Sequence, residues 1–352
     1  MFSYETHDVR VVFGPGALGA LPDVLQRLGA RRVLVVSTPG RADARSAVTL
    51  ALGDACAGVF ERAVVHVPAA VVRAALEASA RSDADSVLAL GGGSAIGLAK
   101  AMAMESARPV IAVPTTYSGS EMTAIWGITD AGAKRTGRDR RAAPRAVLYE
   151  PALTVSLPPD VSAASGMNAM AHCVEALYAV DGHPVASLLA EAGLRTLGRS
   201  LPDIVRHPAD LTGRGDALLG SHLAGRALDL TSMGLQHRLC HVLGGSFGLP
   251  HALTHAIVLP YVVAYNAPAA TEALRVVADA LRSPDAWTGL FAFTRGLGLT
   301  RTLADLGLGE ADLDRAAELT AQGAYPNPRT VTRAGVRAVL TAAYAGEPPA
   351  QF

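Results

Sequence analysis

Histidines are concentrated in one short segment of this chain. Four of its ten histidines lie in GLQHRLCHVLGGSFGLPHALTH, residues 234–255. His237 and His241 are four residues apart and therefore share one face of a predicted helix. The glycine-rich break GGSFGLP precedes His251, and His255 follows one helical turn later. Imidazoles with this spacing can converge on one point, so the segment favours a metal site or a proton-transfer site over isolated core histidines.

A second polar face lies in SGMNAMAHCVEALYA, where Asn168, His172 and Glu175 occupy positions i, i+4 and i+7 of a predicted helix. Side chains with this spacing lie on the same face. His172 is surrounded by apolar neighbours. The spacing alone is compatible with a structural core histidine as well as with a ligand.

Two loops follow predicted strands and are rich in small residues. GGGSAIGLAK (91–100) combines a glycine turn with the start of a helix, where free N–H groups favour a phosphate. VPTTYSGSEMTA (113–124) offers hydroxyl groups to a ribose, a pyrophosphate or a nicotinamide amide. Either loop alone could be a tight connection. Together, at the carboxyl ends of neighbouring strands, they indicate a nucleotide site.

The elements that position these residues differ between the two halves of the chain. The first half alternates strand-like runs with helical patterns and predicts a parallel sheet covered on both faces. The predicted strands are 9–14, 31–38, 59–67, the run from 85 into the glycine turn, and 108–116; the predicted helices are 20–30, 71–84 and the run after the glycine turn to 104. After SLPPD (156–160) long Ala- and Leu-rich helical patterns dominate. We therefore expect an α/β domain, 1–158, and a helical domain, 159–352, with a ligand cleft between them.

Composition limits the partners. Lys plus Arg equals Asp plus Glu, 31 each, so no net charge favours nucleic acid or an anionic membrane. Three cysteines, Cys56, Cys173 and Cys240, form no CxxC pair and predict reduced thiols in a cytoplasm. No signal-like N-terminus and no run of 18 apolar residues is present, so we expect a cytoplasmic protein without a membrane span.

Several motifs in order resemble the iron-containing alcohol dehydrogenase superfamily, and within it the maleylacetate reductases. They are VVFGPGAL (11–18), ALGGGSAIGLAKA (89–101), IAVPTTYSGSEMT (111–123), SAASGMNAMAHCVEALYA (162–179), HRLCHVLGGSFGLPHALTH (237–255), VLPYVVAYN (258–266) and NPRTVT (327–332). The resemblance implies a dehydroquinate synthase-like fold, in which an N-terminal α/β dinucleotide-binding domain with a parallel sheet precedes an all-α C-terminal domain.

The resemblance also implies roles for individual residues. The pyrophosphate of the dinucleotide would lie on Gly91, Gly92, Gly93 and Ser94, and the cofactor would further be lined by Ser37, Thr115, Thr116 and Ser118. The metal-ligand positions of metal-dependent relatives, one Asp and three His, fall on Asn168, His172, His237 and His251. His241 falls on the histidine near the nicotinamide.

Asn168 departs from the metal-dependent pattern. A neutral amide stands where the anionic ligand is expected, and it cannot offset the charge of a divalent cation. We therefore expect no tightly bound metal, and imidazoles that act as proton and hydrogen-bond donors to a substrate oxygen. Gly97 likewise replaces an expected Asp, and Gly248 and Leu253 stand where the closest reductases are expected to have acidic residues, which leaves the substrate open.

The sequence thus predicts an NADH- or NADPH-dependent reductase of a small carboxylated enone or ketone. The model reaction is reduction of maleylacetate to 3-oxoadipate in the degradation of aromatic compounds, or the reaction of a close biosynthetic relative. No acidic residue follows strand 31–36 at Ser37-Thr38-Pro39, and Arg41 lies near enough in sequence to assist a 2′-phosphate, so both cofactors should be used.

The predicted catalytic residues are the imidazoles, with His241 as proton donor and His251 as its partner; the full set is His172, His237, His241 and His251. Asn168, Lys134, Arg238 and Arg329 are the predicted substrate contacts. We expect a homodimer. The alternatives are a metal-dependent alcohol dehydrogenase that tolerates Asn168, and a nucleotide-binding protein without catalysis.

Overall fold

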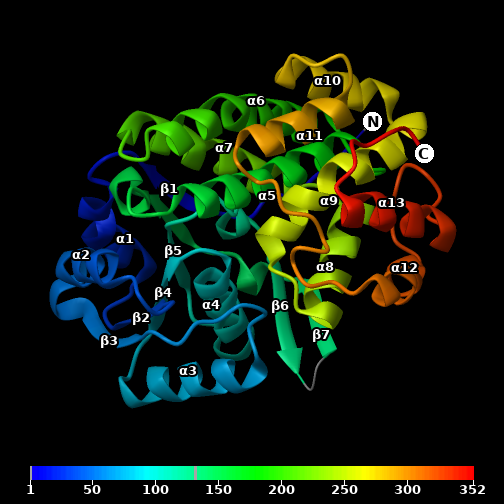
Figure 1. Ribbon diagram of the computed structural model, residues 1–352. Coiled ribbons are helices and arrows are strands. Elements are labelled where there is room, and N and C mark those ends of the chain that lie inside the picture. Colours follow the sequence, from blue (N-terminus) through cyan, green and yellow to red (C-terminus); the bar gives the residue numbers. More distant parts are fainter. Residues whose placement is uncertain (1, 131–132) are drawn as a thin grey trace. The chain divides into compact units, whose positions relative to one another are not determined.

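The computed structural model describes residues 2–130 and 133–352, and it divides into two compact units (Figure 1). The α/β unit comprises Glu5–Leu157 and Ala209–Leu218, and the helical unit comprises Met1–Tyr4, Pro158–Pro208 and Leu219–Phe352. The main change of unit falls between Leu157 and Pro158. Two short segments, the one that ends at Tyr4 and Ala209–Leu218, belong to a different unit from their neighbours in the sequence. We call them the crossing segments; the prediction of two contiguous domains did not include them.

Individual side chains explain the crossing segments. The ring of Tyr4 stacks on His183 of the helical unit, with 5.0 Å between the ring centroids. Arg214 donates to the Tyr117 hydroxyl at 2.8 Å and to the carbonyl of Leu157 at 3.1 Å, both in the α/β unit. Composition and periodicity carry no signal for such contacts, which is why the sequence predicted one clean boundary.

The α/β unit is built on a six-stranded parallel sheet in the order β1-β8-β5-β4-β2-β3. Its strands are short and mostly buried on both faces, as the uninterrupted apolar runs predict. They are β1 (Arg10–Phe13), β2 (Val33–Ser37), β3 (Cys56–Phe60), β4 (Ser86–Gly91), β5 (Val110–Pro114) and β8 (Ala146–Tyr149).

Alternate residues of each strand pack against helices on opposite faces of the sheet. Leu34 and Val36 join one apolar cluster with side chains of α3 (Ala69–Arg81) and α4 (Gly93–Ser106). Val33 and Val35 join another with side chains of α1 (Leu21–Leu28) and α2 (Ala42–Leu52). The sheet is therefore the rigid platform whose strand ends carry the glycine-rich and hydroxyl-rich loops.

Two features of this unit differ from the prediction. The strand expected over 59–67 is instead Cys56–Phe60, and the chain could not continue as a strand to 67 because His66 and Val67 take left-handed backbone angles. An antiparallel hairpin of β6 (Ile125–Asp130) and β7 (Ala133–Arg138) was not predicted. Short 3-10 helices complete the unit: η1 (Ala17–Ala20), η2 (Gly53–Ala55), η3 (Ser120–Met122), η4 (Arg140–Ala142) and η5 (Pro151–Thr154).

The helical unit is organised around α5 (Pro159–Leu177), which packs against α6 (Pro184–Arg206) and α9 (His251–Asn266). Small residues allow this close packing, because a Cβ at Gly166 would lie 2.2 Å from a Leu201 side-chain carbon of α6. The other elements are α7 (Leu211–Asp229), which crosses both units, α8 (Leu235–Phe247), α10 (Thr271–Leu281), α11 (Ala286–Gly296), α12 (Leu313–Ala321), α13 (Arg333–Ala345), η6 (Ala267–Ala269) and η7 (Glu310–Asp312).

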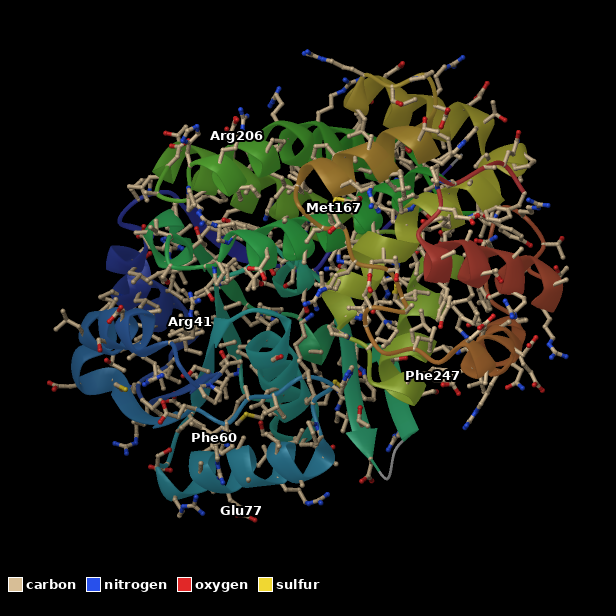
Figure 2. All side chains as sticks on the ribbon, in the orientation of Figure 1. Arg41, Phe60, Glu77, Met167, Arg206 and Phe247 are labelled. Atoms are coloured by element: carbon tan, nitrogen blue, oxygen red, sulfur yellow. The ribbon has the colours of Figure 1, made fainter. Side chains whose placement is uncertain are left out.

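The break predicted over GGSFGLP is shorter than expected. Helix α8 continues to Phe247, which is labelled in Figure 2, and only Gly248 to Pro250 separates it from α9. Gly248 has φ 71°, a left-handed conformation that glycine adopts easily at a helix end. In the part of the chain that the structure describes, no helix is long and apolar enough to cross a membrane.

Candidate active site

Three helices bring the imidazoles predicted from the sequence into one cluster. His172 comes from α5, His237 and His241 from α8, and His251 and His255 from α9. The ring centroids of His172 and His237 are 4.9 Å apart, those of His237 and His255 are 4.9 Å apart, and those of His251 and His255 are 4.6 Å apart. The spacing within 237–255 predicted that these four histidines could converge, whereas the addition of His172 was implied only by the resemblance.

A buried hydrogen-bonded chain runs through this cluster. The Asn168 amide nitrogen is 3.3 Å from His172 Nε2, and His172 Nδ1 is 2.9 Å from His237 Nε2. His237 Nδ1 bonds to Oε2 of Glu175. The amide nitrogen can only donate and a carboxylate can only accept, so the two ends fix the direction of the chain. Each imidazole is then neutral, with its proton on Nδ1.

The first turn of α8 is held by side chains, which sets the position of His237. The N–H of Gln236 donates to Glu175 Oε1 at 2.9 Å, and the N–H of Leu235 donates to Asn327 Oδ1 at 3.2 Å. A Cβ at Gly234 would lie 3.1 Å from Glu175 Oε1. Glu175 thus caps the helix with one oxygen and binds the imidazole with the other.

The imidazoles differ in accessibility. His255 is fully buried, and its Nδ1 lies 3.2 Å from the Gln236 amide nitrogen. Burial, with a smaller contribution from the neighbouring His251, lowers the pKa of His255 well below its usual value, so this ring stays neutral. His241 and His251 are only partly buried and stack with 6.0 Å between centroids. These two rings are the accessible members of the cluster.

A divalent metal does not fit this arrangement of donors. His172 and His237 direct ring nitrogens at each other, and the remaining ring nitrogens bond to Asn168 and Glu175. The set would also lack an anionic ligand at position 168. Among the described residues, no group of three or more His, Cys, Asp or Glu side chains is arranged to hold a metal ion.

The predicted cofactor residues lie at the carboxyl ends of three neighbouring strands of the α/β unit. Ser37 ends β2, Gly91 ends β4, and Thr115 follows β5. The chain passes from β2 to β3 on one side, whereas β4 leads to β5 on the other, so the strand order reverses between β2 and β4. Open α/β sheets bind ligands at such a reversal. The Ser37 hydroxyl is buried there and has no hydrogen-bond partner among the described residues.

The glycine loop leaves space for an anion at the N-terminus of α4. Gly91 has φ 144°, and a Cβ at Gly92 would lie 2.6 Å from Thr116 Oγ1. Both positions therefore require glycine. A Cβ at Gly93 would meet nothing within 4 Å, and the first turn of α4, which begins with Gly93 and Ser94, contains no acidic residue. These features fit a pyrophosphate on free N–H groups.

A buried lysine connects the glycine loop to the hydroxyl-rich loop. Lys100 of α4 is fully buried, and its Nζ donates to the Ser120 carbonyl at 2.5 Å, to Thr123 Oγ1 at 2.9 Å and to the Ile125 carbonyl at 3.0 Å. The N–H of Thr115 also donates to the Gly91 carbonyl at 3.1 Å. The two predicted cofactor loops, the second of which carries Ser118, are thus fixed to one helix.

Glu121 belongs to the hydroxyl-rich loop and connects it to Tyr149 of β8. It is fully buried, and the Tyr149 hydroxyl donates to its Oε1 at 2.8 Å. Burial raises the pKa of Glu121 to about 7, against the opposing effects of the Tyr149 hydrogen bond and the charge of Lys100. This carboxyl has no counterpart in the sequence prediction.

Two of the cations predicted to bind substrate carboxylates donate to main-chain carbonyls of the protein. Arg238 donates to the carbonyls of Leu319 at 3.0 Å and Gln322 at 3.3 Å, at the end of α12. Arg329 donates to the carbonyl of Tyr265 at 2.7 Å. Main-chain oxygens thus already accept from one nitrogen of each guanidinium group. The roles of Arg238 and Arg329 in substrate binding stay predictions.

Two further cations, Lys134 and Arg41, were predicted to bind the substrate and a 2′-phosphate, respectively. Lys134 pairs through its backbone with Thr129 in the β6–β7 hairpin, and its side chain lies outside the described part of the chain. Arg41, predicted to assist a 2′-phosphate, donates to the Leu153 carbonyl at 2.9 Å and is partly buried. One of its nitrogens is therefore already occupied by the protein.

Sequence reasoning missed three residues of the imidazole site. Glu175 was recognised as sharing a face with His172 but was given no role, although a carboxylate in an apolar helix is itself a signal. Gln236 and Asn327 left no such signal, because the contacts of Gln236 with Glu175 and of Asn327 with Leu235 join segments far apart in the chain.

Both halves of the chain match models of one protein family. Residues 8–151 match the iron-containing alcohol dehydrogenase model, and residues 162–344 match the C-terminal model of the Fe-containing alcohol dehydrogenase family. The chain belongs to the iron-containing alcohol dehydrogenase family, a family of oxidoreductases.

Within this family the chain is similar over its whole length to maleylacetate reductases. It is 47% identical to maleylacetate reductase from Sphingobium indicum over 348 residues, which cover 99% of each chain. The crystal structure of maleylacetate reductase from Agrobacterium tumefaciens matches with a TM-score of 0.94 at 42% identity, and that from Rhizobium sp. strain MTP-10005 with 0.93 at 44%, each covering 99% of both chains. The resemblance inferred from the motifs is confirmed.

Proposed function

We propose that this protein reduces maleylacetate to 3-oxoadipate with NADH or NADPH, in the degradation of aromatic compounds. The observation that carries the proposal is the cluster of imidazoles on α5, α8 and α9, in a chain similar throughout to maleylacetate reductases. The α/β unit would bind the dinucleotide at the ends of β2, β4 and β5, and the helical unit would supply the groups that handle protons.

The reduction adds a hydride and a proton across the carbon–carbon double bond conjugated with the ketone. The reduced nicotinamide supplies the hydride. As it adds, the electrons of the double bond shift towards the ketone oxygen, which becomes an enolate that needs hydrogen-bond donors. His241, partly exposed, is the proposed proton donor, and His251, stacked on it, orients the ring. Protonation at carbon completes the saturated ketone.

The buried chain holds the other two imidazoles in a defined protonation state. Because Asn168 donates and Glu175 accepts, His172 and His237 are kept neutral and fixed in orientation. We infer that this network takes the place of a tightly held metal. The neutral Asn168 and the mutual engagement of the ring nitrogens support that inference.

The residues after β2 include no acidic side chain up to Arg41, so nothing there repels a 2′-phosphate, and both cofactors should serve. We propose a cytoplasmic homodimer with a small carboxylated substrate and no nucleic-acid or membrane partner.

The test is oxidation of NADH and NADPH by the purified protein, with maleylacetate, other keto acids and simple aldehydes as acceptors, before and after EDTA treatment. We expect turnover of maleylacetate with both cofactors, unchanged by EDTA. Loss of activity on EDTA treatment with rescue by zinc or ferrous iron would instead indicate a metal-dependent alcohol dehydrogenase. Cofactor binding without turnover of any acceptor would indicate a non-catalytic nucleotide-binding protein. A preference for NADH above roughly a thousandfold in kcat/KM, about 4 kcal/mol, would contradict the cofactor proposal.

A further inference from the structure

Helices α6, α10 and α11 of the helical unit, all labelled in Figure 1, border a pocket of about 340 Å³. Ligand pockets commonly have volumes of about 300–1,000 Å³, so this pocket can hold a small molecule. None of the clustered imidazoles lines it. Its charged lining comprises three arginines and one carboxylate, and the ring of Phe293 on α11 belongs to its apolar wall; the charged residues are Arg195 and Arg199 of α6, Asp279 of α10 and Arg282 at the end of α10.

Positive charge predominates in this pocket. Arg195 and Arg199 are four residues apart on α6, and like charges with this spacing destabilise a helix. Arg195 Nε donates to Glu191 Oε1 at 3.0 Å, which offsets one of the three positive charges. In the described part of the chain, the guanidinium groups of Arg199 and Arg282 form neither an ion pair nor a hydrogen bond. Two cations are therefore available to an anion in the pocket.

Capping of α10 does not explain these arginines. Cationic side chains near the C-terminus of a helix can bond to its last carbonyl groups. Here the Asp279 carbonyl accepts from the main-chain N–H of Arg282 at 3.2 Å. Arg282 itself has φ 53°, a left-handed conformation that glycine adopts more easily. The chain thus carries a less favourable residue at the position where its side chain borders the pocket.

A glycine inside α6 leaves the pocket open. Gly198 lies within the helix, where glycine is unfavourable relative to alanine. On the same helix Gly193 is required by packing, because a Cβ there would lie 2.9 Å from Cys173 Sγ of α5. Among the described residues, a Cβ at Gly198 would approach only the Ala280 carbonyl oxygen, at an ordinary 3.9 Å. Packing therefore does not require glycine at position 198, whereas an open pocket does.

We propose that this pocket binds an aromatic monocarboxylate. The carboxylate would accept from the Arg199 and Arg282 guanidinium groups, whose paired N–H donors match its two oxygens. The aromatic ring would lie against Phe293. Asp279 disfavours a doubly charged anion such as phosphate, because the second negative charge would be repelled by this carboxylate. The pocket is separate from the imidazole cluster, and the proposal does not depend on the proposed reaction.

Isothermal titration calorimetry with sodium benzoate at low ionic strength tests the pocket. We expect the parent to bind one benzoate per chain, more tightly than it binds inorganic phosphate. A variant that combines Arg199→Gln with Arg282→Gly should bind benzoate at least about tenfold more weakly, because it loses both charged hydrogen-bond donors. The matched control is Arg275→Gln, which removes an exposed arginine of α10 that does not line the pocket. Its affinity for benzoate should equal that of the parent.

Gly198→Leu tests the cavity while keeping every charge. The leucine side chain would fill the space beside α10, so we expect loss of measurable benzoate binding. Circular dichroism establishes that each variant is folded, and neither Arg282→Gly nor Gly198→Leu should lower stability, because glycine suits left-handed angles and leucine suits a helix.

Three results would overturn the proposal. They are a parent that does not bind benzoate, a folded pocket variant that binds it as tightly as the parent, and phosphate binding as tight as benzoate binding. Maleylacetate turnover without benzoate is measured separately and should be unchanged in all variants. Failure of benzoate binding therefore leaves the catalytic proposal standing.

Discussion

Replacing Glu175 by Gln tests whether the carboxylate sets the state of the imidazole cluster. Glu175 accepts from two donors at once, the Gln236 N–H at Oε1 and His237 Nδ1 at Oε2. Gln has one acceptor oxygen and one NH₂ group, which only donates. Glu175→Gln is nearly equal in volume, so it changes the hydrogen bonding without leaving a cavity.

The expected losses of stability and of activity in Glu175→Gln follow from this mismatch in hydrogen bonding. If the amide oxygen keeps Gln236, its NH₂ group faces the proton on His237 Nδ1. His237 must then move its proton to Nε2, where it meets the N–H of His172. Leaving one buried donor without an acceptor costs about 1–3 kcal/mol. Loss of a buried partner that orients a site residue commonly lowers activity by about 10–100-fold. We expect both effects in Glu175→Gln.

Urea unfolding followed by circular dichroism measures the first effect, and steady-state maleylacetate reduction measures the second. The matched control is Glu191→Gln, which removes the same charge from an exposed ion pair with Arg195 on α6. That pair should contribute less than about 1 kcal/mol. If Glu175→Gln matches the control in stability and in kcat, the carboxylate does not fix the tautomer of His237. The direction assigned to the hydrogen bonds between Asn168 and Glu175 is then wrong.

Three further perturbations address the other groups. His241→Ala should lower kcat by about a hundredfold or more, with little change in cofactor affinity. In the control His207→Ala, which changes an exposed histidine, kcat should stay within about twofold of the parent value. A small loss of kcat for His241→Ala would mean that another group donates the proton. Asn168→Asp should bind zinc more tightly than the parent in a calorimetric titration, and equal affinity would mean that the imidazoles cannot turn towards a common point. Burial raises the pKa of Glu121 to about 7 from an ordinary 4.5, so the folded state holds this proton more tightly and stability falls as pH rises between these values. Glu121→Gln should therefore remove a decline of about 3 kcal/mol between about pH 4.5 and 7, measured by denaturation across that range, and an unchanged slope would assign the decline to other groups.

The sequence predicted those parts of the fold that follow from local periodicity. The buried strand 31–38 appears as Val33–Ser37, and the helix over 71–84 as Ala69–Arg81. It missed the β6–β7 hairpin, whose stability depends on contacts made after the chain folds. The sequence also predicted too long a break after α8. Gly244 and Gly245 are weak helix formers, yet the structure includes both in the helix.

In the candidate site, too, only the features that depend on local spacing could be predicted from the sequence. The spacing of His237 and His241 on one helix face predicted their shared face, whereas the bond between His172 and His237 joins helices far apart in sequence. The predicted cations show a limit of reasoning from residue type. Arg238 and Arg329 are compatible with carboxylate binding by residue type alone, but folding brings main-chain carbonyls to them first. Residue type predicts what a side chain can bind, and only the fold determines what it does bind.

Asn168 has a consequence that goes beyond the loss of an anionic ligand. With Asn168 at one end of the buried chain and Glu175 at the other, one donor and one acceptor terminate two neutral imidazoles, and every bond has one proton. An aspartate at position 168 would place acceptors at both ends. His172 and His237 would then each turn a proton outwards, and two lone pairs would face each other between the rings unless a further proton or a metal ion lay there. An aspartate at position 168 thus calls for a cation in this network, and we propose that Asn168 removes the need for one.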